Sequence, residues 1–209
     1  MLMGKLLHII ASPREEESRT LQVSEVFLKT FKEKHPEWMI DELNLAKEEI
    51  PALSMKRVDG KYVLLEGKDL FGELKEAWEE IIHHIQRFLS ADIYLVSTPM
   101  WNFNIPYMLK HYIDVIVQPK YLFRYTETGV EGLAKNKKMI VICSRGGQYA
   151  SKEMQSYDFQ EPYLRLIFGF VGITDITFVK AEPMDMGAEI RKQKLNEAQV
   201  AAKQVAEQI

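Results

Sequence analysis

The fold is decided by one stretch, Asp92-Ile93-Tyr94-Leu95-Val96-Ser97-Thr98-Pro99-Met100-Trp101-Asn102-Phe103-Asn104-Ile105-Pro106. It begins with a short apolar run, Asp92 to Thr98, which is typical of a strand buried on both faces. The remainder combines proline, methionine, two aromatic rings and two side-chain amides, and Pro106 stands where a helix can begin. Such a loop suits packing against a planar heterocycle and hydrogen bonding to its polar edge. A flavin is a heterocycle of this kind.

The same alternation of apolar runs and helical spacing continues along the chain. Further strands are expected over Lys5 to Ala11, Met39 to Leu45, Lys138 to Ser144 and Ile173 to Ala181. Helical stripes are expected over Val23 to Phe31, Leu70 to Phe88, from Pro106 onward, Tyr157 to Phe168 and Leu195 to Ile209. Five buried strands that alternate with crossover helices predict an α/β fold: a doubly wound five-stranded parallel sheet with helices on both faces.

Two longer segments interrupt this alternation. Glu48 to Gly67 has no sustained periodicity and is expected to be a surface excursion. Pro119 to Asn136 joins aromatic residues to two glycines, and it can either fold back over the strand-end loops or supply a subunit contact. Since no linker composition or repeat appears, a single domain is expected over residues 1–209.

Composition narrows the class of partner. The 209 residues are 46% hydrophobic and 27% charged, which predicts one packed globular domain. The formal charge of −3 offers no electrostatic case for binding nucleic acid or an anionic membrane, so a small-molecule partner is favoured. No stretch approaches the roughly 20 apolar residues of a membrane span.

Cysteine usage points to the cytoplasm. Cys143 is the only cysteine, which excludes an intrachain disulfide, a thiolate zinc site and an iron–sulfur cluster, and no metal is expected. The opening residues 1–10 resemble a signal peptide, but Lys5 and His8 interrupt a short apolar part, and a first strand is the preferred interpretation.

Two other strand ends carry polar loops. Ser18 and Thr20 follow the first strand, where a helix begins, so they can serve a phosphate or simply cap the helix. The carboxylates of Glu15 to Glu17 would repel a phosphate unless they point outward. After Ser144 and Arg145 come Gly146 and Gly147, which permit close backbone approach to a ring, although a plain turn is the alternative. In a doubly wound sheet these loops share one edge, which predicts a pocket.

Together these loops resemble the FMN-dependent NADH azoreductases, a flavodoxin-like family related to the NAD(P)H quinone reductases. Ser12 with Ser18-Arg19-Thr20 resembles the family's phosphate loop. The ring-contacting loops are matched by Pro99, Met100, Trp101, Asn102 and Phe103 and by Ser144, Arg145, Gly146 and Gly147. The likeness also runs through residues 109–114, 123–125 and 166–173. Trp101 departs from the common Tyr, and Thr20 from a frequent Ser.

The resemblance implies an FMN-dependent NAD(P)H:quinone oxidoreductase or azoreductase with a ping-pong mechanism. Bound FMN takes two electrons from NADH or NADPH and passes them to a quinone or azo compound, so no catalytic side chain is required. It also implies a homodimer with active sites near the interface. Phe123, Tyr125 and Phe159 are the candidates for shaping the substrate pocket, unless these rings fill a core.

Other classes fit the sequence less well. A flavodoxin-type electron carrier or a general NAD(P)H:FMN reductase would also bind FMN, but the aromatic segment after Pro119 favours a covered substrate chamber. A phosphate-controlled signalling domain needs acidic residues where Ser12 and Thr98-Pro99 stand. A nicotinamide-binding dehydrogenase is disfavoured because no Gly-x-Gly-x-x-Gly turn follows the first strand.

Overall fold

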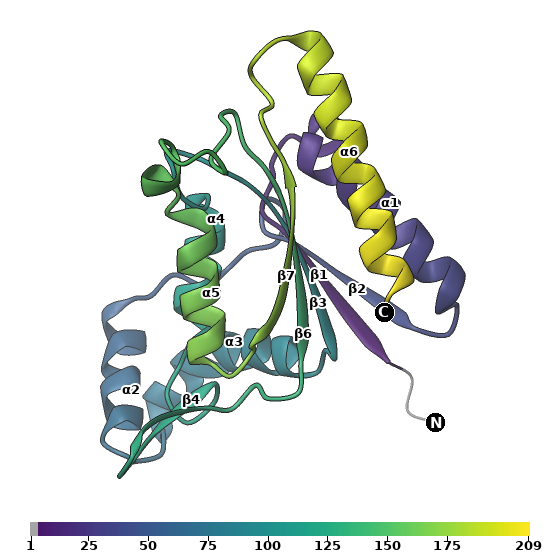
Figure 1. The fold of residues 1–209 in the computed structure, drawn as a ribbon. Coiled ribbons are helices and arrows are strands. Elements are labelled where there is room, and N and C mark those ends of the chain that lie inside the picture. The colour runs from purple at the N-terminus through teal and green to yellow at the C-terminus, as the bar shows by residue number, and fades with distance from the viewer. Residues whose placement is uncertain (1–3) are drawn as a thin grey trace.

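The computed structural model describes residues 4–209 and contains a five-stranded parallel sheet (Figure 1). The sheet order is β2-β1-β3-β6-β7, with β1 Lys5–Ile10, β2 Met39–Asn44, β3 Ile93–Pro99, β6 Lys138–Ser144 and β7 Asp175–Ala181. Counted within this sheet the order is 2-1-3-4-5, the flavodoxin-like form of the doubly wound sheet. All five expected strands and their parallel pairing are therefore confirmed. Residues 1–3 of the opening segment lie outside the described residues.

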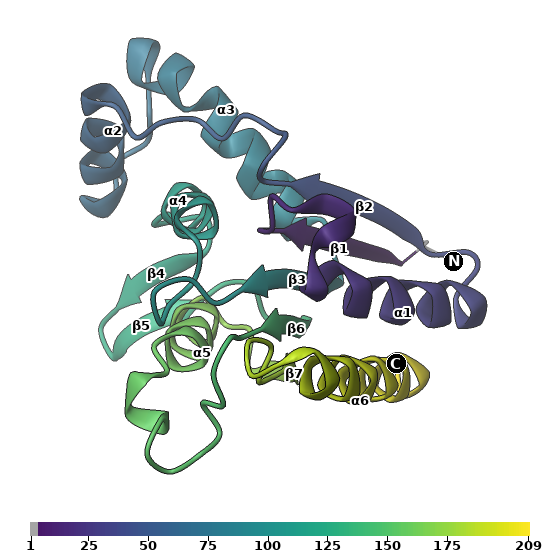
Figure 2. The same cartoon turned by 90° about the horizontal axis from the view of Figure 1, so that it is seen from above.

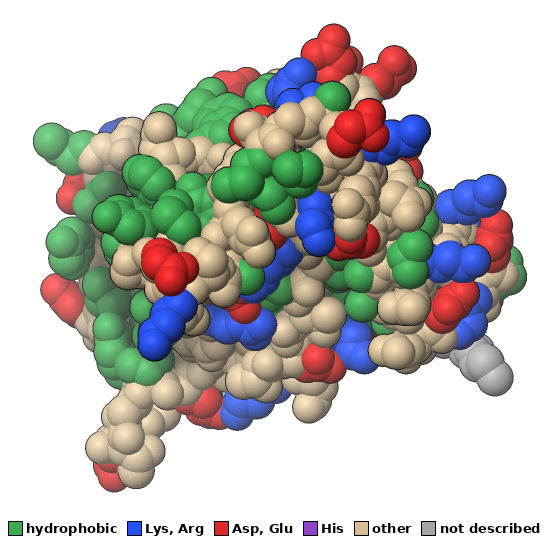
Figure 3. Space-filling model, turned by 45° about the horizontal axis from the view of Figure 1, so that its top comes forward, with side chains coloured by type: hydrophobic (Ala, Val, Ile, Leu, Met, Phe, Trp, Pro, Cys, Tyr) green, Lys and Arg blue, Asp and Glu red, His purple; other side chains and the backbone are tan. Residues whose placement is uncertain are grey.

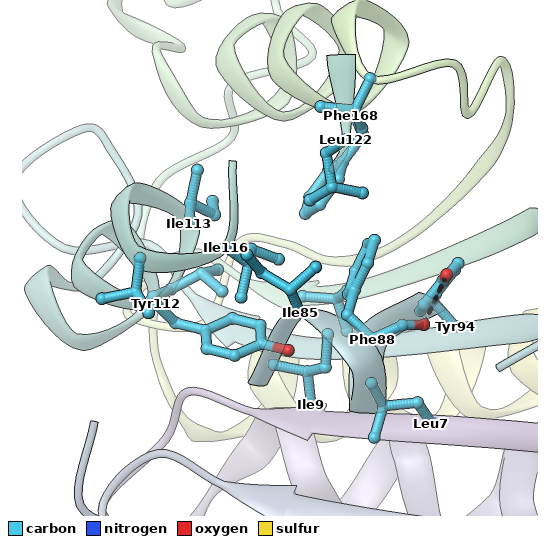
Figure 4. Close-up of a cluster of buried hydrophobic side chains, with 14 of the residues drawn as sticks. Leu7, Ile9, Ile85, Phe88, Tyr94, Tyr112, Ile113, Ile116, Leu122 and Phe168 are labelled. Carbon is cyan, nitrogen blue, oxygen red and sulfur yellow. Dashed lines mark hydrogen bonds between the residues drawn. The ribbon is translucent and has the colours of Figure 1, made fainter. Parts of the chain in front are cut away.

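Helices cover both faces of the sheet (Figure 2). One face carries α1 Arg19–Lys34 and α6 Ala188–Glu207, and the other carries α3 Gly72–Leu89, α4 Tyr107–Ile116 and α5 Gln160–Phe170. Each face has its own apolar core. In the larger one, Phe88 of α3 stacks on Tyr94 of β3 at a ring-centroid distance of 4.3 Å (Figure 4). The strands are thus buried on both faces, as their continuous apolar runs predicted.

A further helix lies in the segment that was expected to be a surface excursion. α2 spans Met55–Leu65 and packs on α3. The helix was not predicted, although the segment does lie at the surface, since only Gly60 and Leu64 of α2 are buried. Gly60 weakens the helical signal, since glycine in a helix interior costs about 1 kcal/mol relative to alanine. The structure needs a glycine there because a Cβ would collide with the Trp78 indole, whose Nε1 donates to the Arg57 carbonyl at 2.9 Å.

The aromatic segment after Pro119 forms a hairpin of β4 Phe123–Thr126 and β5 Gly129–Gly132. Phe123 packs on Phe170 at the end of α5, with ring centroids 4.8 Å apart, and α5 leads into the start of β7. The hairpin therefore lies at the amino end of the sheet, about 20 Å along the strands from their carboxyl ends. It does not fold back over the strand-end loops of its own chain (Figure 1).

The carboxyl ends of the strands meet at the opposite edge, where the strand order reverses between β1 and β3. The Ala11 N–H donates to the Ser97 carbonyl at 2.8 Å, and the Met100 N–H donates to the Ser144 carbonyl at 2.9 Å. The loops after β1, β3 and β6 are thereby tied side by side. Two short 3-10 helices, η1 Glu15–Glu17 and η2 Gln155–Tyr157, flank this edge. No helix within residues 4–209 is long and apolar enough to cross a membrane.

Candidate cofactor site

A cavity of about 230 Å³ opens at this edge and joins the three loops. It is lined by Ser12, Pro13, Arg14, Ser18, Arg19, Pro99, Met100, Trp101, Ser144, Arg145, Gly146, Met184 and Asp185. Nine of these are residues that the sequence singled out. Thr20, Asn102, Phe103 and Gly147 belong to the same loops but do not line the cavity. Parallel strands bring their carboxyl ends to one edge, which is why residues 12, 99 and 146 meet here.

Ser18 combines the two roles that the sequence left open. It caps α1, because its Oγ accepts the Leu21 N–H at 3.3 Å, and it lines the cavity, where Ser12 Oγ donates to it at 2.7 Å. The first N–H groups of α1 have no intrahelical partner and lie at the positive end of a 16-residue helix, so this end of the cavity favours an anion.

The acidic run beside this anion site is exposed, and none of its three residues lines the cavity. Glu15 pairs with Lys47 at 2.9 Å and Glu17 with Arg14 at 3.0 Å, and both carboxylates are largely exposed. The repulsion expected from Glu15 to Glu17 is therefore weakened by solvent and by their basic partners.

A buried polar chain holds the phosphate loop against the sheet. Thr20 Oγ1 bonds to Ser144 Oγ at 2.7 Å, which joins α1 to the end of β6. Beneath it, Ser24 Oγ donates to the Thr20 carbonyl and therefore accepts from Ser97 Oγ, 2.7 Å away. Ser97 in turn accepts from His8 Nε2 at 2.7 Å, which places the imidazole proton on that nitrogen. Burial lowers the pKa of His8 to about 3, so the ring is neutral.

The loop after β3 is a tight turn. Trp101 and Asn104 exchange two backbone hydrogen bonds of 2.8 and 2.9 Å, and the two residues between them have positive φ values, 46° for Asn102 and 69° for Phe103. Asn tolerates this conformation, whereas a bulky aromatic rarely adopts it. The turn exposes the Asn102 amide and the Phe103 ring, which lies 5.8 Å from the Tyr157 ring. Trp101 stands between the main cavity and a second one of about 380 Å³ beside Tyr107.

Arg145 has a structural side chain. It is fully buried, and its Nη1 donates to Asp158 at 2.8 Å and lies 3.5 Å from Glu182. Its Nε donates to Gln160, whose own amide donates to the Pro99 carbonyl at 2.9 Å. The side chain thus ties the loop after β6 to the loop after β3. Only Nη2, buried without a partner among residues 4–209, is left for another acceptor.

The residues fit an FMN cofactor. No acceptor within residues 4–209 takes the backbone N–H of Gly146 or Gly147, and no described group bonds the Asn102 amide. These donors suit the carbonyl-rich edge of a flavin ring, and the hydroxyl-lined end of α1 suits its phosphate. Cys143 adds no thiol chemistry, because burial raises its pKa to about 11.

The three residues predicted to contact substrate lie in two places. Phe159 is at the rim of the site, where its N–H donates to the Phe103 carbonyl at 3.0 Å and its ring is exposed. Phe123 is buried in the hairpin packing, and Tyr125 is exposed on the hairpin at the other end of the sheet. Within one chain neither lines the cavity, so their contact with substrate stays a prediction that needs a second copy.

The sequence reasoning missed Met184 and Asp185, which follow β7. The carboxyl-end rule, applied to the fifth strand as well, would have included this loop. Asp185 accepts a hydrogen bond of 2.7 Å from Arg19 Nη1. Arg19 therefore has a carboxylate partner inside the cavity. Within the described part of the chain, no group of three or more His, Cys, Asp or Glu side chains is placed to hold a metal ion.

Comparison with known proteins gives one consistent family. Residues 4–206 match the model of the flavodoxin-like fold family. Over 99% of the chain, the sequence is 36% identical to an FMN-dependent NADH:quinone oxidoreductase from Desulfotalea psychrophila, covering 98% of that protein. A relative of the same name from Clostridium beijerinckii is 38% identical over 98% of both chains.

Solved structures agree with the sequence relatives. An FMN-dependent NADH-azoreductase from Bacillus anthracis, in complex with FMN, superposes with a TM-score of 0.84 at 31% identity, covering 98% of this chain and 100% of that one. An azoreductase from the same species gives a TM-score of 0.90 at 29% identity over 99% of this chain and 100% of that one. The chain accordingly belongs to the flavodoxin-like fold family and, within it, to the FMN-dependent NADH:quinone oxidoreductases and azoreductases.

Proposed function

We propose that this protein is an FMN-dependent NAD(P)H:quinone oxidoreductase that also reduces azo compounds, by two-electron ping-pong transfer. The observation that carries the proposal is the single cavity that joins Ser18, Trp101 and Gly146 from three separate strand ends. The names of the sequence relatives and of the FMN-bound azoreductase structure support the same activity.

When bound, FMN supplies the redox chemistry, because it accepts hydride from a nicotinamide and passes two electrons to an organic acceptor. The chain itself would bind FMN and orient its ring. The start of α1, with Ser12 and Ser18, would hold the phosphate, and the loops after β3 and β6 would hold the ring. The Gly146 N–H, which has no acceptor within residues 4–209, would be a donor that can stabilise negative charge developing on the ring.

Phe103 and Phe159, exposed at the rim of the site, offer apolar surface to planar substrates. Nicotinamide and acceptor would use the same space in turn, as a ping-pong mechanism requires. We place the enzyme in the cytoplasm with NADH or NADPH as the donor. Recovery of the protein in a secreted or membrane fraction would contradict this location.

The function is tested by the visible spectrum of the purified protein, if necessary after reconstitution with FMN. We expect a flavin spectrum that is bleached by anaerobic NADH or NADPH and restored by menadione. Absence of a flavin spectrum even after reconstitution would contradict the proposal. A flavin-loaded protein that accepts no hydride would indicate an electron carrier instead.

We also propose that the protein is a homodimer. A group of exposed apolar side chains lies on the flank formed by α2, α4 and α5 (Figure 3). Tyr107 and Leu166 are 74% and 72% exposed on this flank, and the hairpin adds Tyr125 at 65%. Exposed apolar area of this kind marks an interaction site. With a second copy bound here, Tyr125 of one subunit could lie beside the active site of the other.

The dimer is tested by Leu166→Glu, which places a charge on this flank at a position that is 72% exposed. Sedimentation velocity should show the wild type as a dimer and the variant as a monomer, because burying an unpaired charge in an interface is costly. Val200→Glu is the matched control, since Val200 is half exposed on α6 at the other face of the sheet. A monomeric wild type, or equal dissociation by both variants, would contradict the proposal.

A further inference from the structure

Asp185 lines the cavity proposed to hold FMN. Its Oδ1 accepts from Arg19 Nη1 at 2.7 Å, at the phosphate end. Its Oδ2 is 2.6 Å from the position that a Cβ on Gly146 would occupy, at the ring end. The Arg19–Asp185 ion pair therefore forms part of the cavity wall. The cavity volume of about 230 Å³ is below the roughly 300–1,000 Å³ of most small-molecule sites.

The backbone of Asp185 is fixed, but its side chain can turn. The Asp185 N–H donates to the Gly146 carbonyl at 3.1 Å, and the Met184 N–H donates to the Arg145 carbonyl at 2.9 Å. The Met184 carbonyl accepts from Arg191 Nε at 2.8 Å as well as from Arg19. In contrast, the Asp185 side chain is 64% exposed. Rotation of this side chain releases Arg19 Nη1 from the carboxylate without moving the loop, while the bond of 3.1 Å from Arg19 Nη1 to the Met184 carbonyl can remain.

An incoming phosphate would compete with Asp185 for the same guanidinium. A phosphate group carries about two negative charges near neutral pH, and Arg binds phosphate and carboxylate through the same donors. The second arginine of the cavity, Arg14, is engaged by Glu17. The Asp185 carboxylate and the phosphate thus compete for Arg19. Asp185 also repels the phosphate directly.

We propose that Asp185 is a positioning residue that holds Arg19 in the flavin-free protein and yields it to the phosphate of FMN. The inference rests on the proposed function and deepens it. Asp185 weakens the binding of a phosphorylated flavin and leaves the binding of a phosphate-free flavin unchanged. It thereby sets how readily the enzyme gains and loses its cofactor.

The test is a titration of the full-length apoprotein with FMN and, separately, with riboflavin, followed by quenching of flavin fluorescence. Asp185→Asn should tighten FMN binding about 5-fold, the upper end for an exposed ion pair, and leave riboflavin binding unchanged. Glu189→Gln is the matched control. It removes the same charge from the first turn of α6, outside the cavity, and should leave both affinities unchanged.

A second comparison measures the effect of Asp185→Asn on FMN affinity in a variant that lacks Arg19. Arg19→Gln should weaken FMN binding, and adding Asp185→Asn to it should then gain less than in the wild type, because the contested cation is gone. Equal weakening of FMN and riboflavin by Asp185→Asn would overturn the inference, since Asp185 would then contact a part common to both flavins. The inference would also be overturned if Asp185→Asn changed the affinity for neither flavin. The same holds if Asp185→Asn tightened FMN binding as much in the Arg19→Gln variant as in the wild type. A wild type that binds no FMN would contradict the proposed function itself.

Discussion

Replacing Arg145 by methionine should lower the free energy of unfolding by about 3–5 kcal/mol, the usual cost of removing one partner of a buried ion pair. The Arg145 side chain is fully buried, and its partners Asp158 and Glu182 are only 10% and 8% exposed. The substitution would leave both carboxylates buried without a cation. Urea unfolding of the flavin-free protein measures the loss.

Two further variants identify the cause. Arg165→Met removes an arginine that is 47% exposed and pairs with Glu161, and it should cost less than about 1 kcal/mol. Adding Asp158→Asn and Glu182→Gln to Arg145→Met removes the unpaired charges and should restore most of the stability. Asn keeps the oxygen that accepts the Gln160 and Glu161 N–H groups at the start of α5. Failure of this rescue would contradict the assignment of the loss to unpaired charge.

The same arginine makes the cofactor site depend on the core. Through Gln160 it holds the Pro99 carbonyl, and so it fixes the spacing of the loops after β3 and β6. FMN affinity should therefore fall in Arg145→Met and stay reduced in the rescued triple variant, where the link to Gln160 is still missing. The sequence placed Arg145 among the cofactor-binding residues. We now predict that only its backbone, and Nη2 at most, is available to FMN.

The fold was predictable because apolar runs decide it locally. The strand from Lys138 to Ser144 was expected and observed with the same bounds, and the others differ by one or two residues at their ends. Such runs can only be buried on both faces, which requires the crossover helices that were expected. The helix around Gly60 was not predictable, because the Trp78 ring that makes a glycine necessary there is a tertiary contact.

The candidate site was predictable only in part. Parallel topology brings residues 18, 101 and 146 to one edge, whatever their side chains. Asp185 was not predicted as a site residue, because its role depends on Arg19, 166 residues away, and on the missing Cβ of Gly146. The position of the hairpin was not predictable for a different reason. Aromatic density indicates that Tyr121 to Tyr125 need to be covered, but not at which end of the sheet they lie.

Replacing Gly146 by valine should weaken FMN binding by about 100-fold, measured by quenching of flavin fluorescence. Gly146 lines the cavity, and its N–H has no acceptor in the described part of the chain, so a branched side chain here would stand between the backbone and the ring. Its Cβ would also collide with the Asp185 carboxylate, 2.6 Å away. Gly147→Ala is the matched control, since its Cβ would meet only the Tyr149 ring at 3.4 Å, an ordinary contact, and FMN should bind nearly as in the wild type.

The two causes are separated by combining Gly146→Val with Asp185→Ala. If access to the Gly146 backbone is what FMN needs, binding stays weak after the carboxylate is removed. This is the result that we expect. The exposed Asp185 side chain can turn away from the methyl groups of the introduced valine, whereas a flavin ring cannot occupy the space that they fill. Recovery of wild-type affinity in the double variant would mean that the glycine serves Asp185 alone, and the loop after β6 would then not be a ring-binding loop.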